Sequence, residues 1–178
     1  MTFNGAWGYY PSIPDEAWRT VRDVITMLRT ATAGAGNLLF NIGPEADGSV
    51  PPLARERLRV VGKWLARHGE AVYGRVDRTD GQVAGGNTGG WTLKGKTGFF
   101  WMNRWPGSWI AIGGLLTKVK RITYLDSGKP LAFRQSYRKL IVEGLPAECP
   151  ERVAGYPVLK VAFAGRPRQV LGSGYVTL

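Results

Sequence analysis

A short apolar run between turn residues constrains the fold of this chain most strongly. Residues 37–42 read Asn-Leu-Leu-Phe-Asn-Ile, and a loop containing glycine and acidic residues, 43–49, follows at once. An apolar run of this length predicts a fully buried strand of the kind found in parallel sheets. In such sheets the loops after the strands carry the chemistry. We therefore expect a buried strand Asn37–Ile42 that ends at the rim of an active site.

Helical patterns flank this predicted strand on both sides. Ser12 and Asp15 have the spacing of a capping box, which predicts a helix from Ser12 to about Ala31. A second helix is predicted from near Pro51 to Gly69, where glycine gives a C-terminal stop. Helix, strand and helix belong to an α/β architecture. One strand and two helices cannot close a sheet, so we expect this unit to be the end of something larger.

The pattern changes after Tyr73-Gly74. The segment 81–98 is rich in glycine, and short β-type runs then recur between turn signals. Short strands at this spacing predict an antiparallel sandwich. We place the domain boundary near residues 74–80, with an α/β unit over 1–75 and a sandwich over 76–178. The predicted strands are Gly98–Asn103, Trp109–Ile112, Val119–Leu125, Lys139–Val142 and Val158–Phe163.

The charge balance and the scarce metal-ligand residues limit the classes of partner. Lys and Arg outnumber Asp and Glu by 24 to 13, which can mark a nucleic-acid binder, but the basic residues form no dense block. The basic residues lie closest together on the second predicted helix, where we expect them to form its solvent-exposed face. No apolar run reaches the roughly 20 residues of a membrane span, and the first residues lack the features of a signal peptide. With Cys149 as the single cysteine and His68 as the single histidine, we expect no disulfide, metal site or cofactor.

Three motifs give the chain a resemblance to a known enzyme family. In order and spacing they resemble the C-terminal portion of an α-L-fucosidase of glycoside hydrolase family 29. The resemblance implies an α/β fragment, namely the last helix-strand-helix elements of a (β/α)₈-like barrel, followed by an antiparallel β-sandwich. The motifs are Met1-Thr2 with Trp7-Gly8-Tyr9, residues 36–44 with Asp47-Gly48, and Gly62-Lys63-Trp64-Leu65 running into residues 69–74.

The resemblance also implies a reaction. The family hydrolyses terminal α-L-fucosides with retention of configuration, which requires two carboxyl groups about 5–5.5 Å apart. By resemblance, the nucleophile is an Asp earlier in the barrel, and the acid/base is a Glu a few residues before the Met-Thr motif. Neither residue lies in this sequence. We therefore expect no catalytic residue here and no activity of this chain alone.

Carboxylates within the chain offer a possible substitute. Glu45 and Asp47 follow the predicted strand and could point into one site. The alternative is that Asp47-Gly48 forms a turn in which Asp47 accepts hydrogen bonds from backbone amides. Glu70 follows a helix end, where we expect it to cap or pair locally. His68 is expected to interact with the last carbonyls of the second helix.

Aromatic and amide side chains suggest where a sugar would bind. Trp7, Tyr9 and Tyr10 precede the first predicted helix, and they either stack on a sugar or anchor the loop. Asn41 either bonds the substrate or braces neighbouring loops. We take Trp7, Tyr9 and Asn41 as candidate substrate-binding residues. The tryptophans of the predicted sandwich form either a core or a carbohydrate-binding face; they are Trp91, Trp101, Trp105 and Trp109.

Three functional hypotheses remain. The first is a C-terminal fragment of a retaining α-L-fucosidase that acts on a fucosylated glycan and associates with a missing N-terminal segment or with itself. The second is a non-catalytic carbohydrate-binding β-sandwich module. The third is a nucleic-acid-binding protein, whose affinity would fall steeply with salt. Scattered charges without a motif disfavour the third, so we expect neither nucleic acid nor membrane as a partner.

Overall fold

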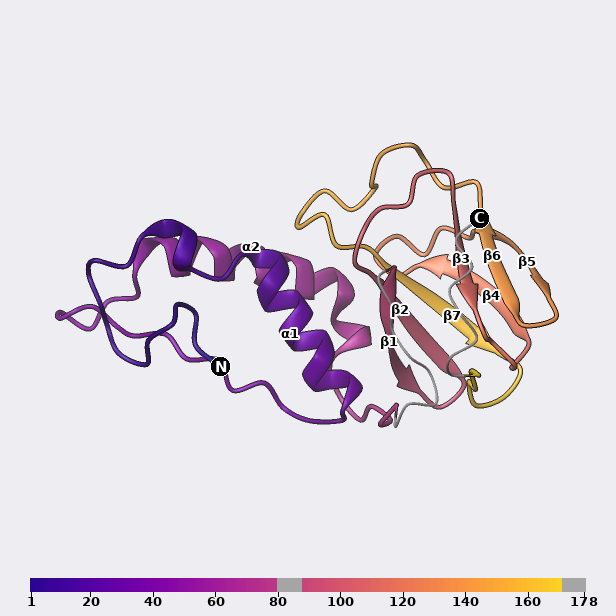
Figure 1. The fold of residues 1–178 in the computed structure, drawn as a ribbon, viewed down its shortest axis with the longest axis horizontal. Coiled ribbons are helices and arrows are strands. Elements are labelled where there is room, and N and C mark those ends of the chain that lie inside the picture. Colours follow the sequence, from indigo (N-terminus) through magenta and orange to yellow (C-terminus); the bar gives the residue numbers. More distant parts are fainter. Residues whose placement is uncertain (80–87, 171–178) are drawn as a thin grey trace.

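The computed structural model describes residues 1–79 and 88–170. Two helices and the loops around them form one end of the structure, and antiparallel strands form the other (Figure 1). In chain order the described elements are η1 (Asp15–Ala17), α1 (Val21–Ala33), α2 (Pro52–His68), η2 (Gly69–Ala71), β1 (Gly89–Lys94), β2 (Thr97–Met102), β3 (Trp109–Gly113), β4 (Val119–Tyr124), β5 (Ala132–Ser136), β6 (Lys139–Glu143) and β7 (Val158–Phe163).

Helix α1 begins later than Ser12, so the predicted start is wrong. Its capping box is formed by Thr20 and Asp23, each side chain accepting a hydrogen bond from the backbone amide of the other. Residues 15–17 form only a short 3₁₀ turn. Trp18 is buried and packs edge-on against Phe3, with ring centroids 5.6 Å apart. The backbone at Trp18 is extended, and it separates the 3₁₀ turn at residues 15–17 from helix α1.

Helix α2 agrees with the prediction. It runs from Pro52 to His68, with Pro51 before it and Gly69 at its C-terminal end. Ala54, Val61 and Trp64 are buried on its inner face. Because its apolar positions recur at helical spacing, the pattern alone was enough to find it.

The predicted buried strand Asn37–Ile42 is wrong in its burial and in its extent. The only pairing recorded there in the described chain is a parallel bridge between Thr2 and Asn41. Leu39 is 76% exposed, whereas Phe40 is half-buried and packs edge-on against Phe3 at 5.1 Å. The segment is extended but is covered on one side only, because residues 1–3 are the single described neighbour that pairs with it.

The strands form two antiparallel sheets. The order is β1-β2-β7-β4 in the four-stranded sheet and β3-β6-β5 in the three-stranded sheet. All five predicted strands are confirmed. Strands β1 and β5 were not predicted, because Gly89 and Gly90 open β1 and because β5 alternates exposed polar residues around Phe133.

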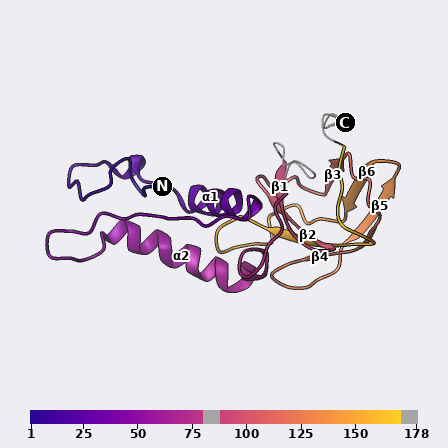
Figure 2. The same cartoon turned by 90° about the horizontal axis from the view of Figure 1, so that it is seen from below.

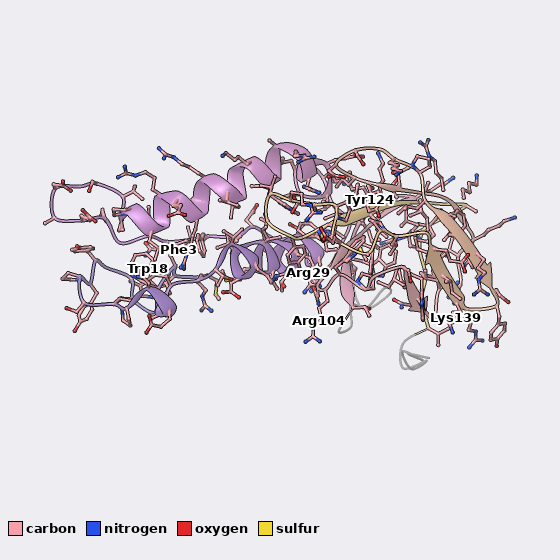
Figure 3. The ribbon with its side chains drawn as sticks, turned by 90° about the horizontal axis from the view of Figure 1, so that it is seen from above. Phe3, Trp18, Arg29, Arg104, Tyr124 and Lys139 are labelled. Atoms are coloured by element: carbon pink, nitrogen blue, oxygen red, sulfur yellow. The ribbon has the colours of Figure 1, made fainter. Side chains whose placement is uncertain are left out.

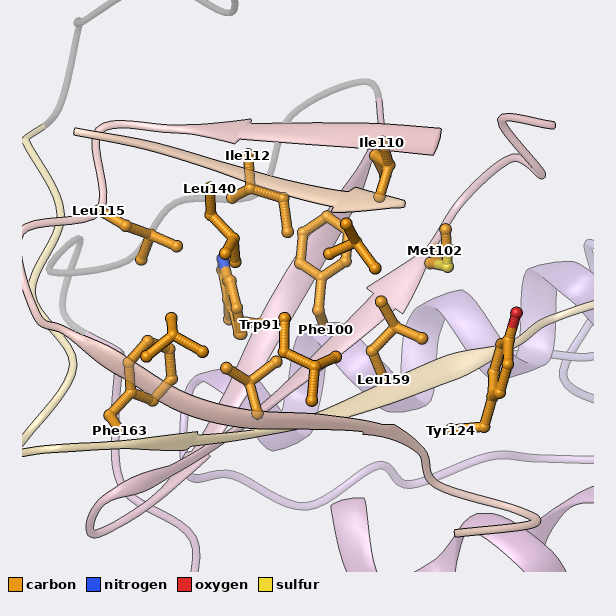
Figure 4. Packing of buried hydrophobic residues seen from close by; sticks show 14 of the residues in the cluster. Trp91, Phe100, Met102, Ile110, Ile112, Leu115, Tyr124, Leu140, Leu159 and Phe163 are labelled. Atoms are coloured by element: carbon orange, nitrogen blue, oxygen red, sulfur yellow. The ribbon is translucent and has the colours of Figure 1, made fainter. Parts of the chain in front are cut away.

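A hydrophobic core fills the space between the two sheets. Figure 4 shows Trp91, Phe100 and Phe163 of the four-stranded sheet facing Ile112 and Leu140 of the three-stranded sheet. Residues of this core alternate along each strand with residues that face the other way, as the two-residue period of a strand requires.

A second core joins the four-stranded sheet to the helices. Phe99 and Trp101 of β2 point away from the first core and pack in a cluster with Ile25 of α1 and Trp64 of α2. The indole Nε1 of Trp64 donates a 2.8 Å hydrogen bond to the carbonyl oxygen of Tyr156. Figures 1 and 2 show both helices on the β1–β2 side of the strands. The four-stranded sheet is therefore buried on both faces where the helices cover it.

Candidate functional site

The three predicted substrate-binding residues lie together at the loop end of the structure. The side-chain amide of Asn41 donates a 2.7 Å hydrogen bond to the carbonyl oxygen of Trp7. The indole of Trp7 is 65% exposed and the phenol of Tyr9 is 42% exposed. Asn41 therefore braces the loop that presents these two rings to solvent.

Gly43 brings the two loops into backbone contact. A Cβ atom at this position would lie 2.3 Å from the carbonyl carbon of Gly8 and 2.4 Å from the amide nitrogen of Tyr9. No side chain fits at that distance, so glycine is required for the approach. The loop carrying Trp7 and Tyr9 is thus held at both Asn41 and Gly43.

Hydrogen bonds within the turn occupy both acidic residues after Asn41. Asp47 accepts a 2.9 Å hydrogen bond from the amide of Ser49, and the Ser49 hydroxyl donates to Glu45 at 3.0 Å. The bond from the Ser49 amide is the main cause that lowers the pKa of Asp47 below its ordinary value. The turn interpretation of Asp47 is confirmed, and the Asp47 carboxylate does not have the environment of a general acid, whose pKa must be raised.

His68 lies in the second core. Its ring is fully buried and stacks on Trp64, with centroids 4.4 Å apart and an interplanar angle of 11°. Its Nδ1 lies 3.0 Å from the carbonyl oxygen of Trp64, which confirms the expected contact with the last carbonyls of α2. Burial is the largest cause that lowers the pKa of His68. In this position it braces the end of the helix.

The tryptophans of the sheets separate into core and surface. Trp91 and Trp101 are buried, and Trp105 is partly buried with its Nε1 bonded to the carbonyl oxygen of Pro146 at 2.9 Å. Trp109 is 43% exposed on β3. The core alternative is therefore confirmed for Trp91 and Trp101, and a carbohydrate-binding face built from all four is contradicted because these two rings are buried.

A cavity that the sequence did not predict lies on the outer face of β4 and β7. It has a volume of about 280 Å³ and is lined by Glu70, Arg121, Thr123 and Lys160, among others. Glu70 pairs with Lys160 at 2.6 Å, so it contacts the sheet instead of pairing locally. The sequence offered one signal for this cavity: Arg121 and Thr123 are polar and two residues apart, so they lie on the same face of a strand.

The described residues contain neither a metal-ligand cluster nor a helix that could span a membrane. No group of three or more His, Cys, Asp or Glu side chains within 1–79 and 88–170 could hold a metal ion. No helix in these ranges has the length and apolar character needed to cross a bilayer.

In Figure 3, Phe3 and Trp18 mark the loop end, and Lys139 lies at the opposite end of the structure.

The sequence has relatives among curated α-L-fucosidases. A family model described as Alpha-L-fucosidase matches residues 1–70. The plasma α-L-fucosidase of Rattus norvegicus is 40% identical over 68 residues, which are 38% of this chain and 15% of the relative. The tissue α-L-fucosidase of Bos taurus is 31% identical over 132 residues, which are 71% of this chain and 27% of the relative.

Solved structures of α-fucosidases match about nine-tenths of the chain. Isoenzyme 1 of the α-L-fucosidase from Paenibacillus thiaminolyticus superposes with a TM-score of 0.79 and 26% identity, over 92% of this chain and 38% of that one. An α-fucosidase of Thermotoga maritima, in complex with a mechanism-based inhibitor, gives a TM-score of 0.76 and 25% identity over 90% of this chain and 38% of that one.

The chain therefore spans well under half the length of the relatives it matches, from 15% to 38% in these four comparisons. The family model matches the residues that form the helices and the braced loop, and the fold match, which covers at least 90% of the chain, includes the strands as well. On these grounds the chain belongs to the α-L-fucosidase family, glycoside hydrolase family 29, and corresponds to part of the full-length enzyme.

Proposed function

We propose that this chain forms the C-terminal part of a retaining α-L-fucosidase that removes terminal α-L-fucose from glycoconjugates. The observation that carries the proposal is the superposition on the Paenibacillus α-L-fucosidase over 92% of the chain with a TM-score of 0.79. In this assignment residues 1–75 are the last helix-strand-helix elements of a (β/α)₈-like barrel, and residues 76–178 form a C-terminal β-sandwich domain.

The arrangement of residues 1–41 supports the barrel assignment. The backbone of residues 1–3 pairs in parallel with residues 39–41, through bonds of 3.0 Å from the Phe3 amide to the Asn41 carbonyl and 2.9 Å from the Asn41 amide to the Met1 carbonyl. Helix α1 lies between these two segments in sequence. Parallel segments joined through a helix are the βαβ unit from which such barrels are built. The exposed Leu39 is then a position that neighbouring barrel elements would cover.

The loop residues support a role in substrate binding. The exposed rings of Trp7 and Tyr9 can stack on the apolar face of a fucose residue, and Asn41 keeps their loop in place. The carboxylates of Glu45 and Asp47, which follow Asn41 in sequence, are bonded within their own turn. We infer that this chain helps to position the sugar and that the nucleophile and the acid/base belong to other parts of the enzyme.

The proposal is tested by a chimera. Replacing the corresponding part of the Paenibacillus isoenzyme with this chain should give a protein that hydrolyses 4-nitrophenyl α-L-fucoside, while the purified chain alone should not. Trp7→Ala in the chimera should raise KM, and Asn41→Leu should do so through the unbraced loop. Asn37→Ala, at an exposed position, is the matched control and should leave KM unchanged.

Two outcomes would contradict the proposal. A folded chimera without fucosidase activity would contradict the proposal that this chain forms the C-terminal part of such an enzyme. Turnover by the isolated chain that Glu45→Gln or Asp47→Asn abolished would show that these carboxylates are catalytic after all.

The second candidate function is a non-catalytic carbohydrate-binding β-sandwich module. One observation favours it, the exposed Trp109 on a strand of the three-stranded sheet. Buried Trp91 cannot take part, and Trp105 is bonded to the backbone. Association with a missing N-terminal segment or with a second copy is a further part of the proposal, supported by the one-sided pairing of residues 39–41. Neither nucleic acid nor membrane is proposed as a partner in this role.

A further inference from the structure

The outer face of the three-stranded sheet carries a regular array of side chains. The register aligns three rows across β3, β6 and β5, with β6 in the middle. These rows are Trp109–Glu143–Ala132, Ala111–Ile141–Arg134 and Gly113–Lys139–Ser136. The intervening residues, such as Ile110, Leu140 and Val142, point into the core between the sheets. The nine outward residues therefore form one surface, which we call the outer face of β3-β6-β5.

Trp109 is the only aromatic residue among these nine. The other outward residues of its strand are Ala111 and Gly113, and Ala132 stands in its own row. Small neighbours leave the indole face accessible, in agreement with its exposure of 43%. Within the described ranges, the indole takes part in no recorded ring contact or hydrogen bond. An accessible, unoccupied indole of this kind provides the stacking surface that the C–H face of a pyranose requires.

Paired polar groups lie next to the indole. Glu143 is directly opposite Trp109, and directly opposite residues have Cβ atoms about 4.5–5.5 Å apart. Its Oε1 accepts a 2.7 Å hydrogen bond from Nε of Arg134, and the two side chains are 43% and 68% exposed. The guanidinium keeps its terminal N–H groups available, so the pair offers planar donors beside carboxylate acceptors. This combination can bind neighbouring sugar hydroxyls.

The opposite end of the same face is basic. Residues 132–143 contain the three cations Arg134, Arg138 and Lys139 against the single anion Glu143. Within residues 1–79 and 88–170, neither Arg138 nor Lys139 has a carboxylate partner. Charge complementarity therefore favours a ligand that carries negative groups at this end.

The turn between β5 and β6 adds an exposed ring next to these cations. Tyr137 is 85% exposed and has a φ of 53°, a left-handed conformation that is an outlier for a bulky residue. The guanidinium of Arg138 lies 4.8 Å from the centroid of its ring. A strained, exposed aromatic residue at a hairpin turn points to a contact made with something outside the chain.

We propose that the outer face of β3-β6-β5 binds an acidic glycan, with a pyranose ring stacked on Trp109 and a carboxylate or sulfate group held by Lys139 and Arg138. The helices pack against the other sheet, so this face lies at the far end of the structure from the braced loop (Figure 1). The site is thus separate from the proposed fucoside site, and its test involves no hydrolysis.

Binding is measured with defined polymers on the full chain at pH 7. Isothermal titration calorimetry with polygalacturonate and with dextran sulfate should show binding that weakens as NaCl is raised. Neutral dextran should bind at least ten-fold more weakly. Trp109→Ala should weaken polygalacturonate binding at least ten-fold, and Trp109→Phe should retain part of the affinity. Arg138→Gln with Lys139→Gln should remove the preference for the charged polymers.

Matched control variants distinguish binding at a specific site from attraction by the overall positive charge of the chain. Arg59→Gln with Lys63→Gln removes two exposed cations from α2, and Tyr73→Ala removes an aromatic ring that is 61% exposed. Both should leave binding unchanged. Thermal unfolding of every variant shows whether it is folded, and Trp109→Phe tests the site if Trp109→Ala does not fold.

Three results would overturn the proposal. Binding that does not respond to Trp109→Ala or Trp109→Phe would remove the stacking site. An equal loss in the α2 double variant would show attraction by overall charge only. Tighter binding of a single-stranded oligonucleotide such as dT₂₀, lost in the same Trp109 variants, would assign the face to nucleic acid instead.

Discussion

The imidazole of His68 lies flat against the indole of Trp64, with ring centroids 4.4 Å apart, and its Nε2 has no hydrogen-bond partner among residues 1–79 and 88–170. A protonated ring would place an unsolvated charge at the contact between α2 and the strands. The histidine is therefore held neutral in the fold, mainly by burial. Glu151 and Asp126 act in the opposite direction through their charges, as does the bond to the Trp64 carbonyl, while Arg67 adds to the effect of burial.

This geometry predicts a pH dependence of stability. The pKa of His68 in the folded state is below the ordinary histidine value of 6.5, so the unfolded chain takes up a proton first as pH falls. The free energy of unfolding should decrease below about pH 6.5 and level off once the pH passes the folded-state pKa. Urea titrations between pH 7.5 and pH 5 measure it. His68→Phe keeps a ring on Trp64 and should flatten the curve there; an unchanged slope would contradict the assignment.

Two glycines should respond oppositely to alanine. Gly62 lies within α2 with nothing within 4 Å of an added Cβ, so Gly62→Ala should stabilise the protein by about 0.5–1 kcal/mol. Gly43→Ala places its Cβ 2.3 Å from the Gly8 carbonyl carbon and should destabilise by about 1–3 kcal/mol. Chemical denaturation gives both values. Limited proteolysis should also cut residues 5–12 faster in Gly43→Ala, and equal cutting in the two variants would count against the loop contact.

Glu151 should be required for folding in a way that Glu148 is not. The Glu151 carboxylate is 2% exposed and accepts bonds of 2.8, 2.9 and 3.0 Å from the amides of Val153, Ala154 and Tyr156. Glu151→Gln removes charge-assisted bonds and should cost about 1–3 kcal/mol. Glu148 pairs with Arg152 at 76% side-chain exposure, where solvent screens the charges, so Glu148→Gln should leave the unfolding midpoint essentially unchanged. Similar unfolding midpoints for the two variants would refute the difference.

Truncating two tryptophans should give different losses of stability. Trp101 is fully buried between β2 and the helices, and its Nε1 donates a 3.0 Å bond to the Thr92 hydroxyl. Trp101→Ala should cost about 3–5 kcal/mol, the usual range for a core aromatic. Trp109→Ala should cost less than about 1 kcal/mol because its ring is exposed. A large loss at Trp109 would mean that its ring is structural and would weaken its assignment to ligand binding.

Local patterns were sufficient for much of the fold. The stripe of α2 and the five predicted strands follow from the periodicity of their own residues. The start of α1 does not, because both Ser12/Asp15 and Thr20/Asp23 have the spacing of a capping box. The burial of Trp18 against Phe3 decides between them, and that contact is invisible in the local sequence.

The substrate-binding role of Trp7, Tyr9 and Asn41 stays a prediction made from residue type and position. The structure adds contacts that the sequence did not predict: Asn41 donates to the Trp7 carbonyl, and Gly43 lies against the backbone of Gly8 and Tyr9. The burial of residues 37–42 was mispredicted because it depends on how many neighbours pair with the segment. Likewise, the two-residue period of a strand shows that Trp91 and Trp109 each face the opposite side from their sequence neighbours. It does not show which side of each strand faces a hydrophobic core.

Strand β2 is buried on both faces, so an alternation of polar and apolar residues cannot determine how it aligns with its neighbouring strands. A one-residue slip would exchange Phe99 and Trp101 for Phe100 and Met102, so apolar side chains would still enter both cores. Shape must then set the alignment. At Gly98 an added Cβ would lie 2.9 Å from both Trp91 and Phe163, so this space accepts only a residue without a side chain. A one-residue shift of β2 would bring a residue with a side chain against these two rings, so the small size of Gly98 favours the observed alignment of β2 with β1 and β7.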